Sequence, residues 1–216
     1  MSDLMEKFTF LGEVVHQAFE IRTQARDRAL AQARQLTRYA AHAIRAIHRN
    51  ERKQAEEHLQ QAHRLVETLQ QELQPYPELY FAGYTQDAIK EYCEARITAA
   101  IILDHPLPLP EELNVEVPTY VNGLAEVPGE LRRRVLDILR QGYSEEAERL
   151  LGAMDEIYAL LVTLDYPDAV TNGLRRQTDL VRGIVERTRG DLTLSLREEK
   201  LKQALQEVVN RLPSES

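Results

Sequence analysis

The sequence predicts an all-α protein, and three observations carry this prediction. Residues 5–74 contain no proline and only Gly12, and they are rich in residues that form helices well. No segment alternates apolar and polar residues in the way a half-buried strand does. Hydrophobic residues make up 43% of the 216 residues and aromatic residues only 6%, with no tryptophan, which favours aliphatic packing between helices. We therefore expect six or seven helices in a single domain over residues 1–216.

The first two helices follow from this proline-free stretch. A long helix from about Met5 should break near Asn50, and a second should end before Pro75. Apolar residues at helical spacing mark one face of the first helix as buried. At about 100° per residue, five arginines fall within about 60° of one another on the opposite face. These arginines, here called the arginine rail, are Arg34, Arg38, Arg45, Arg49 and Arg52.

The middle of the chain contributes the third and fourth helices. The third should start after Gly83 with Thr85 as its N-cap, and it ends in an apolar run that indicates burial. The segment HPLPLP, residues 105–110, cannot continue a helix and predicts a stiff connector. Asn114 or Pro118 should open the fourth helix, which stops at Gly142.

The last third of the chain predicts two or three further helices. Ser144 is a good N-cap for a helix to about Val162, and Asp165 with Pro167 or Asp168 should open the next. Gly190 should mark a break in helical structure, and residues 190–196 should lead into a final amphipathic segment. We expect residues 210–216 to form a frayed tail.

Composition excludes several functional classes. The single cysteine, Cys93, rules out an internal disulfide and a cysteine-rich zinc site, which suits a cytoplasmic location. No apolar window is long enough to cross a bilayer, so we expect no membrane association. Glycine-rich phosphate loops are missing from the sequence. The pair Glu13 and His16 is an isolated Glu-x-x-His motif, and a di-iron bundle needs that motif on two helices.

Net charge is −8, yet the charge is unevenly distributed. Residues 21–65 contain ten Lys or Arg against four Asp or Glu, a local balance of +6. A basic strip inside an acidic protein can bind phosphates through counterion release. A solvated helix face is the alternative interpretation of the arginine rail.

Two pairs of glutamates suggest a metal site. Glu91 and Glu94 are three residues apart, and Glu126 and Glu130 are four apart, so each pair projects from one side of its helix. The pairs could meet if their helices are antiparallel neighbours. Converging carboxylates repel each other, and Mg²⁺, or Mn²⁺ in its place, removes that cost because it prefers oxygen ligands. Glutamates at this spacing are also common on solvated faces, so the spacing alone leaves both interpretations open.

Four segments resemble the translin/TRAX family, in the same order along the chain. IKEYCEA, residues 89–95, is similar to the IQEYVEA element of TRAX, and YVNGLAEVPGELRR, residues 120–133, is similar to its DYLLGVADLTGELMR element. LTRYAAHAIRAIHR, residues 36–49, resembles the corresponding N-terminal helix. LRRQTDLVRGIVERTRGDL, residues 174–192, resembles the C-terminal helix that translin and TRAX share.

This resemblance implies a seven-helix subunit that assembles into a closed barrel around single-stranded RNA or DNA. It implies a homo-oligomer, an octamer if the family pattern holds, with the arginine rail directed to the nucleic acid. By matching position, Glu91, Glu94, Glu126 and Glu130 fall on the acidic residues of a Mg²⁺-dependent endoribonuclease site. Retention of all four acids favours the catalytic TRAX branch. The alternatives are a translin-like scaffold that binds single-stranded RNA or DNA without cutting it, and a purely structural oligomer.

Three positions depart from the family pattern. Glu126 replaces an aspartate, Pro128 stands where a helix-compatible residue is usual, and Thr119 stands where an aspartate is frequent. The longer side chain of Glu126 and a rotation at Pro128 affect the geometry of a bound metal. They bear on rate and metal preference more than on the class of reaction.

Overall fold

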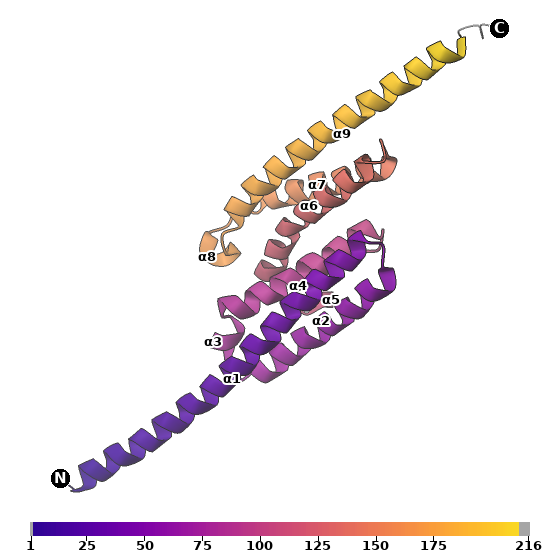
Figure 1. Cartoon of the computed structure of the whole chain (residues 1–216). Helices are drawn as coiled ribbons and strands as arrows, with labels where there is room; N and C mark the ends of the chain where they lie inside the picture. The colour runs from indigo at the N-terminus through magenta and orange to yellow at the C-terminus, as the bar shows by residue number, and fades with distance from the viewer. Residues whose placement is uncertain (1, 212–216) are drawn as a thin grey trace.

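The computed structural model describes residues 2–211, and this part of the chain is built from helices (Figure 1). Six helices contain 19 to 47 residues, and three contain only four. In chain order they are α1 Ser2–His48, α2 Arg52–Leu73, α3 Pro77–Tyr80, α4 Gly83–Ile102, α5 Pro110–Leu113, α6 Val117–Leu139, α7 Glu145–Thr163, α8 Asp168–Thr171 and α9 Leu174–Arg211. The prediction of an all-α fold is confirmed.

The helices pack in two groups that meet where α4 contacts α6. In one group α1 packs on α2 and α4, and in the other α6 packs on α7 and α9 (Figure 1). One continuous core joins the groups, with Leu36, Leu69, Ile89, Leu131 and Met154 fully buried along it. The core is mainly aliphatic, as the composition predicts.

Two helix boundaries follow the sequence prediction closely. The break between α1 and α2 falls at Asn50, which adopts a left-handed conformation with φ of 59°. Arg52 is therefore the first residue of α2 and Arg49 lies in the turn before it, so only Arg34, Arg38 and Arg45 of the arginine rail lie on α1. Ser144 caps α7, since its hydroxyl accepts a hydrogen bond from the Glu146 amide.

Two other expectations are wrong. Thr85 does not cap α4, because the helix already begins at Gly83 and the Thr85 hydroxyl donates to the Leu79 carbonyl instead. Gly190 does not interrupt the last helix, because the 38-residue α9 continues through it. One helical glycine costs only about 1 kcal/mol, which good helix formers on both sides offset. Of the predicted frayed tail, residues 210 and 211 belong to α9, and residues 212–216 lie outside the described part.

The glutamate-bearing helices α4 and α6 run parallel, so the antiparallel arrangement considered for the two pairs of glutamates is wrong. Thr119 of α6 contacts Gln86 of α4, and further along both helices Glu126 contacts Lys90. The direction follows from the connector, residues 103–116, which returns along the bundle through α5 so that α6 starts beside the start of α4.

A glycine lets α4 and α6 approach closely. A Cβ atom at Gly123 would lie 2.7 Å from the Cys93 Cβ and 2.8 Å from the Lys90 carbonyl oxygen, closer than atoms can pack. Cys93 is fully buried against this contact, as expected of a small core residue. The contact brings the backbones of the two acid-bearing helices together.

Both ends of the chain project from the body as helical arms (Figure 1). Residues 3–24 of α1 and 201–211 of α9 are almost entirely exposed. The first arm presents Phe8, Phe10 and Phe19, each more than 60% exposed, and the second presents Leu201 and Leu205. Apolar stretches of this kind on a surface indicate contact with another molecule. Across the residues described, no helix has both the length and the apolar character needed to span a membrane.

Candidate metal centre and nucleic-acid interface

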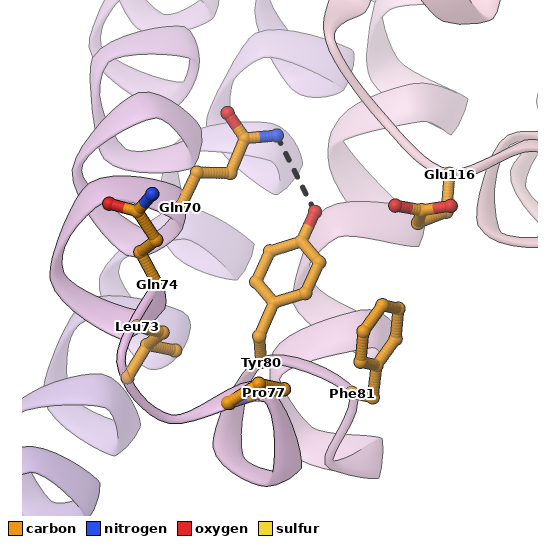
Figure 2. A pocket seen from close by; sticks show the side chains of 7 residues that line it. All are labelled: Gln70, Leu73, Gln74, Pro77, Tyr80, Phe81 and Glu116. Carbon is orange, nitrogen blue, oxygen red and sulfur yellow. Dashed lines mark hydrogen bonds between the residues drawn. The ribbon is translucent and has the colours of Figure 1, made fainter.

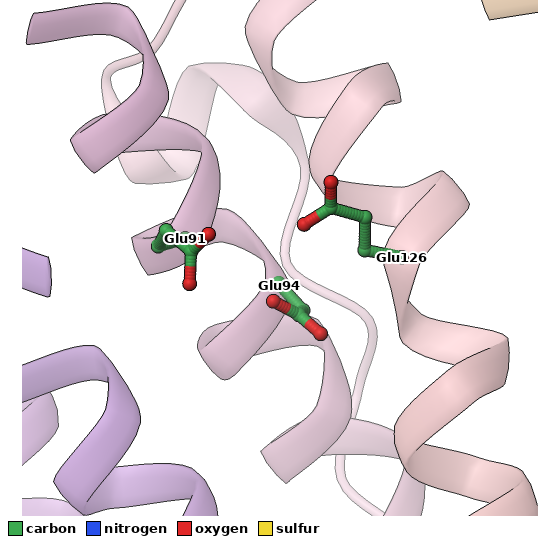
Figure 3. A group of neighbouring side chains, drawn as sticks. All are labelled: Glu91, Glu94 and Glu126. Carbon is green, nitrogen blue, oxygen red and sulfur yellow. The ribbon is translucent and has the colours of Figure 1, made fainter. Parts of the chain in front are cut away.

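Three of the four predicted site glutamates converge between α4 and α6. Carboxylate oxygens of Glu91, Glu94 and Glu126 all lie within 4.8 Å of one another. Figure 3 shows Glu126 reaching from α6 toward the two glutamates of α4. Glu94 is 8% exposed, whereas Glu91 and Glu126 are half-buried and open to solvent on one side. Within the described part of the chain, this is the one group of acidic, histidine or cysteine side chains with the geometry of a metal site.

Local sequence explains why these side chains meet. Glu91 and Glu94 lie one turn apart on α4, so they share a face. Glu126 lies three residues beyond Gly123, and therefore on the face of α6 that contacts α4. Because α4 and α6 run parallel, each turn after the glycine contact stays beside its counterpart on the other helix.

The carboxylates destabilise one another in the absence of a cation. Burial raises the pKa of Glu94 to about 8, and the charges of Glu126, Glu91 and Glu130 add to that rise. Burial and the charge of Glu126 also raise the pKa of Glu91. A buried carboxyl group with neighbours of its own charge favours a bound cation, since the cation removes both the repulsion and the desolvation cost.

Lys90 supplies one positive charge to the group. Its ammonium Nζ lies 2.7 Å from the Glu126 Oε1, and both side chains are partly buried, at 20% and 32% exposure. Sequence reasoning missed this residue, although it stands directly before Glu91 in the motif. A lysine at that position in IKEYCEA, where TRAX has glutamine, was the available signal.

Glu130, the fourth predicted ligand, lies outside the group of three and has a partner of its own. Its Oε2 is 2.6 Å from the His48 Nε2 and 3.7 Å from the Arg133 guanidinium. The hydrogen bond from His48 lowers the pKa of Glu130 despite its burial. The His48 side chain is only 4% exposed, so this contact is internal. Since 82 residues separate His48 from Glu130, no spacing rule could have found the pair.

The donor set of Glu91, Glu94 and Glu126 fits a hard divalent cation. Mg²⁺ and Mn²⁺ favour carboxylate oxygens and retain several waters, so one buried and two partly exposed carboxylates suit them. No nitrogen or sulfur ligand lies in the group, which argues against zinc or copper.

All five rail arginines are exposed. None of them takes part in the ion pairs found among the described residues. Arg34 shares a surface hollow of about 530 Å³ with Glu91, and Tyr84 and Asp87 also line it. Partial burial and the charges of Arg45, His58 and Arg38 lower the pKa of His42, which indicates a positive local field. The rail therefore begins beside the acidic group and offers free guanidinium donors to phosphates.

Other features carry no comparable chemistry. A hollow of about 310 Å³ between α2 and α3 is lined by amide, aromatic and apolar side chains, with Glu116 as its one charged group. In Figure 2 the Gln70 amide donates to the Tyr80 hydroxyl at its edge, at 3.4 Å. Glu13 and His16 are exposed on the α1 arm and belong to no ligand group in the residues described.

Comparison with known proteins places the chain among close relatives. No protein-family model matches it. An uncharacterised protein of Methanocaldococcus jannaschii is 35% identical over 185 residues, which cover 85% of this chain and 82% of that protein. The structure of AfC3PO in complex with duplex RNA is 32% identical and superposes with a TM-score of 0.81, covering 86% of this chain and 96% of the other.

Two further structures show the same architecture. The crystal structure of AfC3PO is 31% identical with a TM-score of 0.79, covering 86% of this chain and 97% of the other. The crystal structure of apo-NeC3PO has a TM-score of 0.78 over 85% of this chain and 96% of the other, but at 21% identity it shows the fold alone. C3PO complexes are assemblies of translin/TRAX subunits.

Proposed function

This chain belongs to the translin/TRAX family, and we propose that it is a metal-dependent endoribonuclease that acts inside an assembly of identical subunits. The observation that carries the proposal is the convergence of Glu91, Glu94 and Glu126 within 4.8 Å. A set of three carboxylates with one buried member destabilises a protein unless a cation or a proton compensates it. A cation bound by these three carboxylates would serve the hydrolysis of a phosphodiester.

Each residue of the site has a role in this mechanism. Mg²⁺, or Mn²⁺ in its place, would supply an activated water and neutralise charge on the phosphate when bound. Glu91, Glu94 and Glu126 would hold the cation, and Glu94 would give up a proton to do so. Glu130 stays ionised beside His48, so it can accept a proton from the attacking water as a general base. Arg34, at the edge of the same hollow as Glu91, can position a neighbouring phosphate.

The arginine rail is the proposed surface for RNA. Guanidinium groups bind phosphates without regard to base sequence, and they make affinity fall with salt. The related AfC3PO has been captured with duplex RNA, which supports RNA as the ligand class. The family resemblance points to single-stranded RNA as the substrate, with single-stranded DNA as a second ligand, so all three nucleic acids belong in the test.

The helical arms support an oligomer. The apolar side chains of the two arms, residues 3–24 and 201–211, are exposed in a single subunit, and a second copy of the chain would cover them. We propose a closed homo-oligomer, with eight subunits as the family pattern implies. Light scattering after gel filtration measures the subunit number directly. Replacement of Phe8 and Phe19 by Glu should lower it, because a charge buried in an interface is costly.

A non-catalytic RNA-binding scaffold is the second candidate, and one observation favours it. Lys90 pairs with Glu126, and His48 pairs with Glu130, so two of the four acids already have partners within the chain. These pairs could make the acidic group a structural feature. Binding and cleavage must therefore be measured separately.

Cleavage is tested with end-labelled single-stranded RNA, duplex RNA and single-stranded DNA in Mg²⁺, Mn²⁺ or EDTA. The test variant is Glu91→Gln with Glu126→Gln, which keeps side-chain size and removes two ligand charges. The matched control is Glu111→Gln with Glu116→Gln, which removes two exposed charges away from the site. We expect metal-dependent internal cuts that the test variant loses and the control retains. Binding without cuts in every reaction supports the scaffold instead.

RNA binding is tested by reversing charge on the rail. Arg38→Glu with Arg45→Glu should weaken RNA binding and reduce its salt dependence, because two phosphate contacts are lost. Arg176→Glu with Arg197→Glu makes the same change of charge at exposed positions of α9 outside the arm and serves as the control. Equal loss of affinity in both variants would show that only net charge matters.

A further inference from the structure

Lys90 lies inside the acidic group, where its position is unlike that of a surface lysine. Its ammonium is 2.7 Å from Glu126, and its side chain is only 20% exposed. Burial alone would lower the pKa of Lys90, but the hydrogen bond and charge of Glu126, with Glu91 and Asp87, raise it overall. The Lys90 ammonium therefore stays positively charged over the whole physiological pH range.

The same Glu126 carboxylate belongs to the set of three that fits a divalent cation. A cation of this type binds carboxylate oxygens at about 2.1 Å and tolerates little distortion of its ligands. The Lys90 ammonium already occupies one Glu126 oxygen, and its charge repels a second cation nearby. Coordination by Glu126 thus competes with the bond to Lys90.

The structure also offers the ammonium another position. Asp87 lies three residues before Lys90 on α4, within reach on the same helix surface, and it is exposed. A lysine side chain with four rotatable bonds can swing toward Asp87 without any movement of the backbone. Displacement from Glu126 therefore leaves the charge paired and closer to solvent.

We propose that Lys90 is a built-in counter-ion of the carboxylate site, which holds Glu126 until a divalent cation displaces it and so sets the metal concentration at which the site fills. This inference rests on the proposed metal-dependent function. Lys90 acts through Glu126 and is a positioning residue. TRAX has glutamine at this position of the motif, so Lys90→Gln introduces a residue that the motif accommodates.

The test measures binding of Mn²⁺ alone by calorimetry to the full-length protein. Lys90→Gln should bind Mn²⁺ about tenfold more tightly or better, since it removes both a competitor and a like charge. Lys90→Arg keeps the charge and should remain close to the original affinity. Lys53→Gln removes an exposed charge from α2 and is the control for net charge.

Thermal unfolding in EDTA gives a second measurement that needs no bound metal. Without the counter-ion, Lys90→Gln should unfold at a lower temperature than Lys53→Gln, and saturating Mn²⁺ should reverse that order. Unchanged or weaker Mn²⁺ affinity in Lys90→Gln, with clear binding by the original protein, overturns the proposal and leaves the metal-dependent function intact. Failure of every variant and of the original protein to bind Mn²⁺ overturns both.

Discussion

Replacement of Glu94 by Gln should stabilise the metal-free protein at alkaline pH while it abolishes metal binding. Glu94 is 8% exposed and close to two other carboxylates, and its pKa is raised from 4.5 to about 8. The folded state therefore binds a proton that the unfolded state releases. Glutamine keeps the size of the side chain and removes the charge, so it isolates the electrostatic part of the cost.

The magnitude follows from linkage between protonation and folding. Below about pH 4.5, Glu94 is protonated in both states and costs nothing. As the pH rises from there to about 8, the unfolded state gains stability by ionising, so the free energy of unfolding falls. A pKa rise from 4.5 to about 8 corresponds to a limit of about 5 kcal/mol, at about 1.36 kcal/mol for each tenfold change. Shared protonation with Glu91 reduces this, and we expect about 2 to 5 kcal/mol.

The assay is urea denaturation in EDTA at about pH 5, 7 and 9. Glu94→Gln should differ little from the original protein at the lowest pH and exceed it increasingly above neutrality. Glu130→Gln is the control of opposite sign, because His48 lowers the pKa of Glu130. A lowered pKa stabilises the fold above the unfolded-state value, so this variant should lose stability at neutral pH.

Two results would refute this reasoning. One is a pH-independent difference between Glu94→Gln and the original protein, which would show that the effect comes from packing. The other is a loss of stability in Glu94→Gln at every pH, which would show that the ionised carboxylate is satisfied in the metal-free protein.

Three further predictions test the same geometry. Metal binding at pH 7 should release up to about one proton, because Glu94 with a pKa of about 8 must ionise, and calorimetry in buffers of different ionisation enthalpy measures this release. Gly123→Ala should cost about 1 to 3 kcal/mol of stability and weaken Mn²⁺ binding, since its Cβ would meet α4 at 2.7 Å. Gly129→Ala on the same helix meets nothing within 4 Å and should leave both unchanged or slightly improved in the same denaturation and calorimetry experiments. Ser144→Ala removes the cap of α7 and should cost about 1 kcal/mol in urea denaturation, and no loss there would show that water replaces the hydroxyl.

The parts of the fold that could be predicted from the sequence are those set by local chemistry. Proline-free helical periodicity located α1 and α2, and the hydroxyl of Ser144 marked the start of α7. Gly190 was misleading because a glycine weakens a helix by a small amount that neighbouring residues outweigh. The expected orientation of α6 relative to α4 was wrong, because it depends on how the connector at 103–116 folds back. No periodicity in the sequence encodes that path.

The candidate site shows the same division. Spacing within a helix placed Glu91 beside Glu94, and the family resemblance selected Glu126 to face them. Lys90, the partner of Glu126, and His48, the partner of Glu130, were missed, since each contact joins two helices far apart in the chain. Pairings of this kind depend on crossing geometry, which for α4 and α6 is set by Gly123.

The internal partners of the acids explain how the chain can fold before it binds metal. Of the four predicted acids, Glu126 and Glu130 pair with Lys90 and His48, while Glu94 is the one whose pKa rises most clearly. At neutral pH Glu94 can therefore hold a proton, which leaves Glu91 as the one acid of the four with neither a proton nor a partner to compensate it. Because His48 belongs to α1, its contact with Glu130 ties the helix that carries most of the arginine rail to α6, which carries two of the four acids. An RNA strand held along α1 would thus have a fixed position relative to the carboxylates, which is the condition that cleavage at a defined phosphate requires.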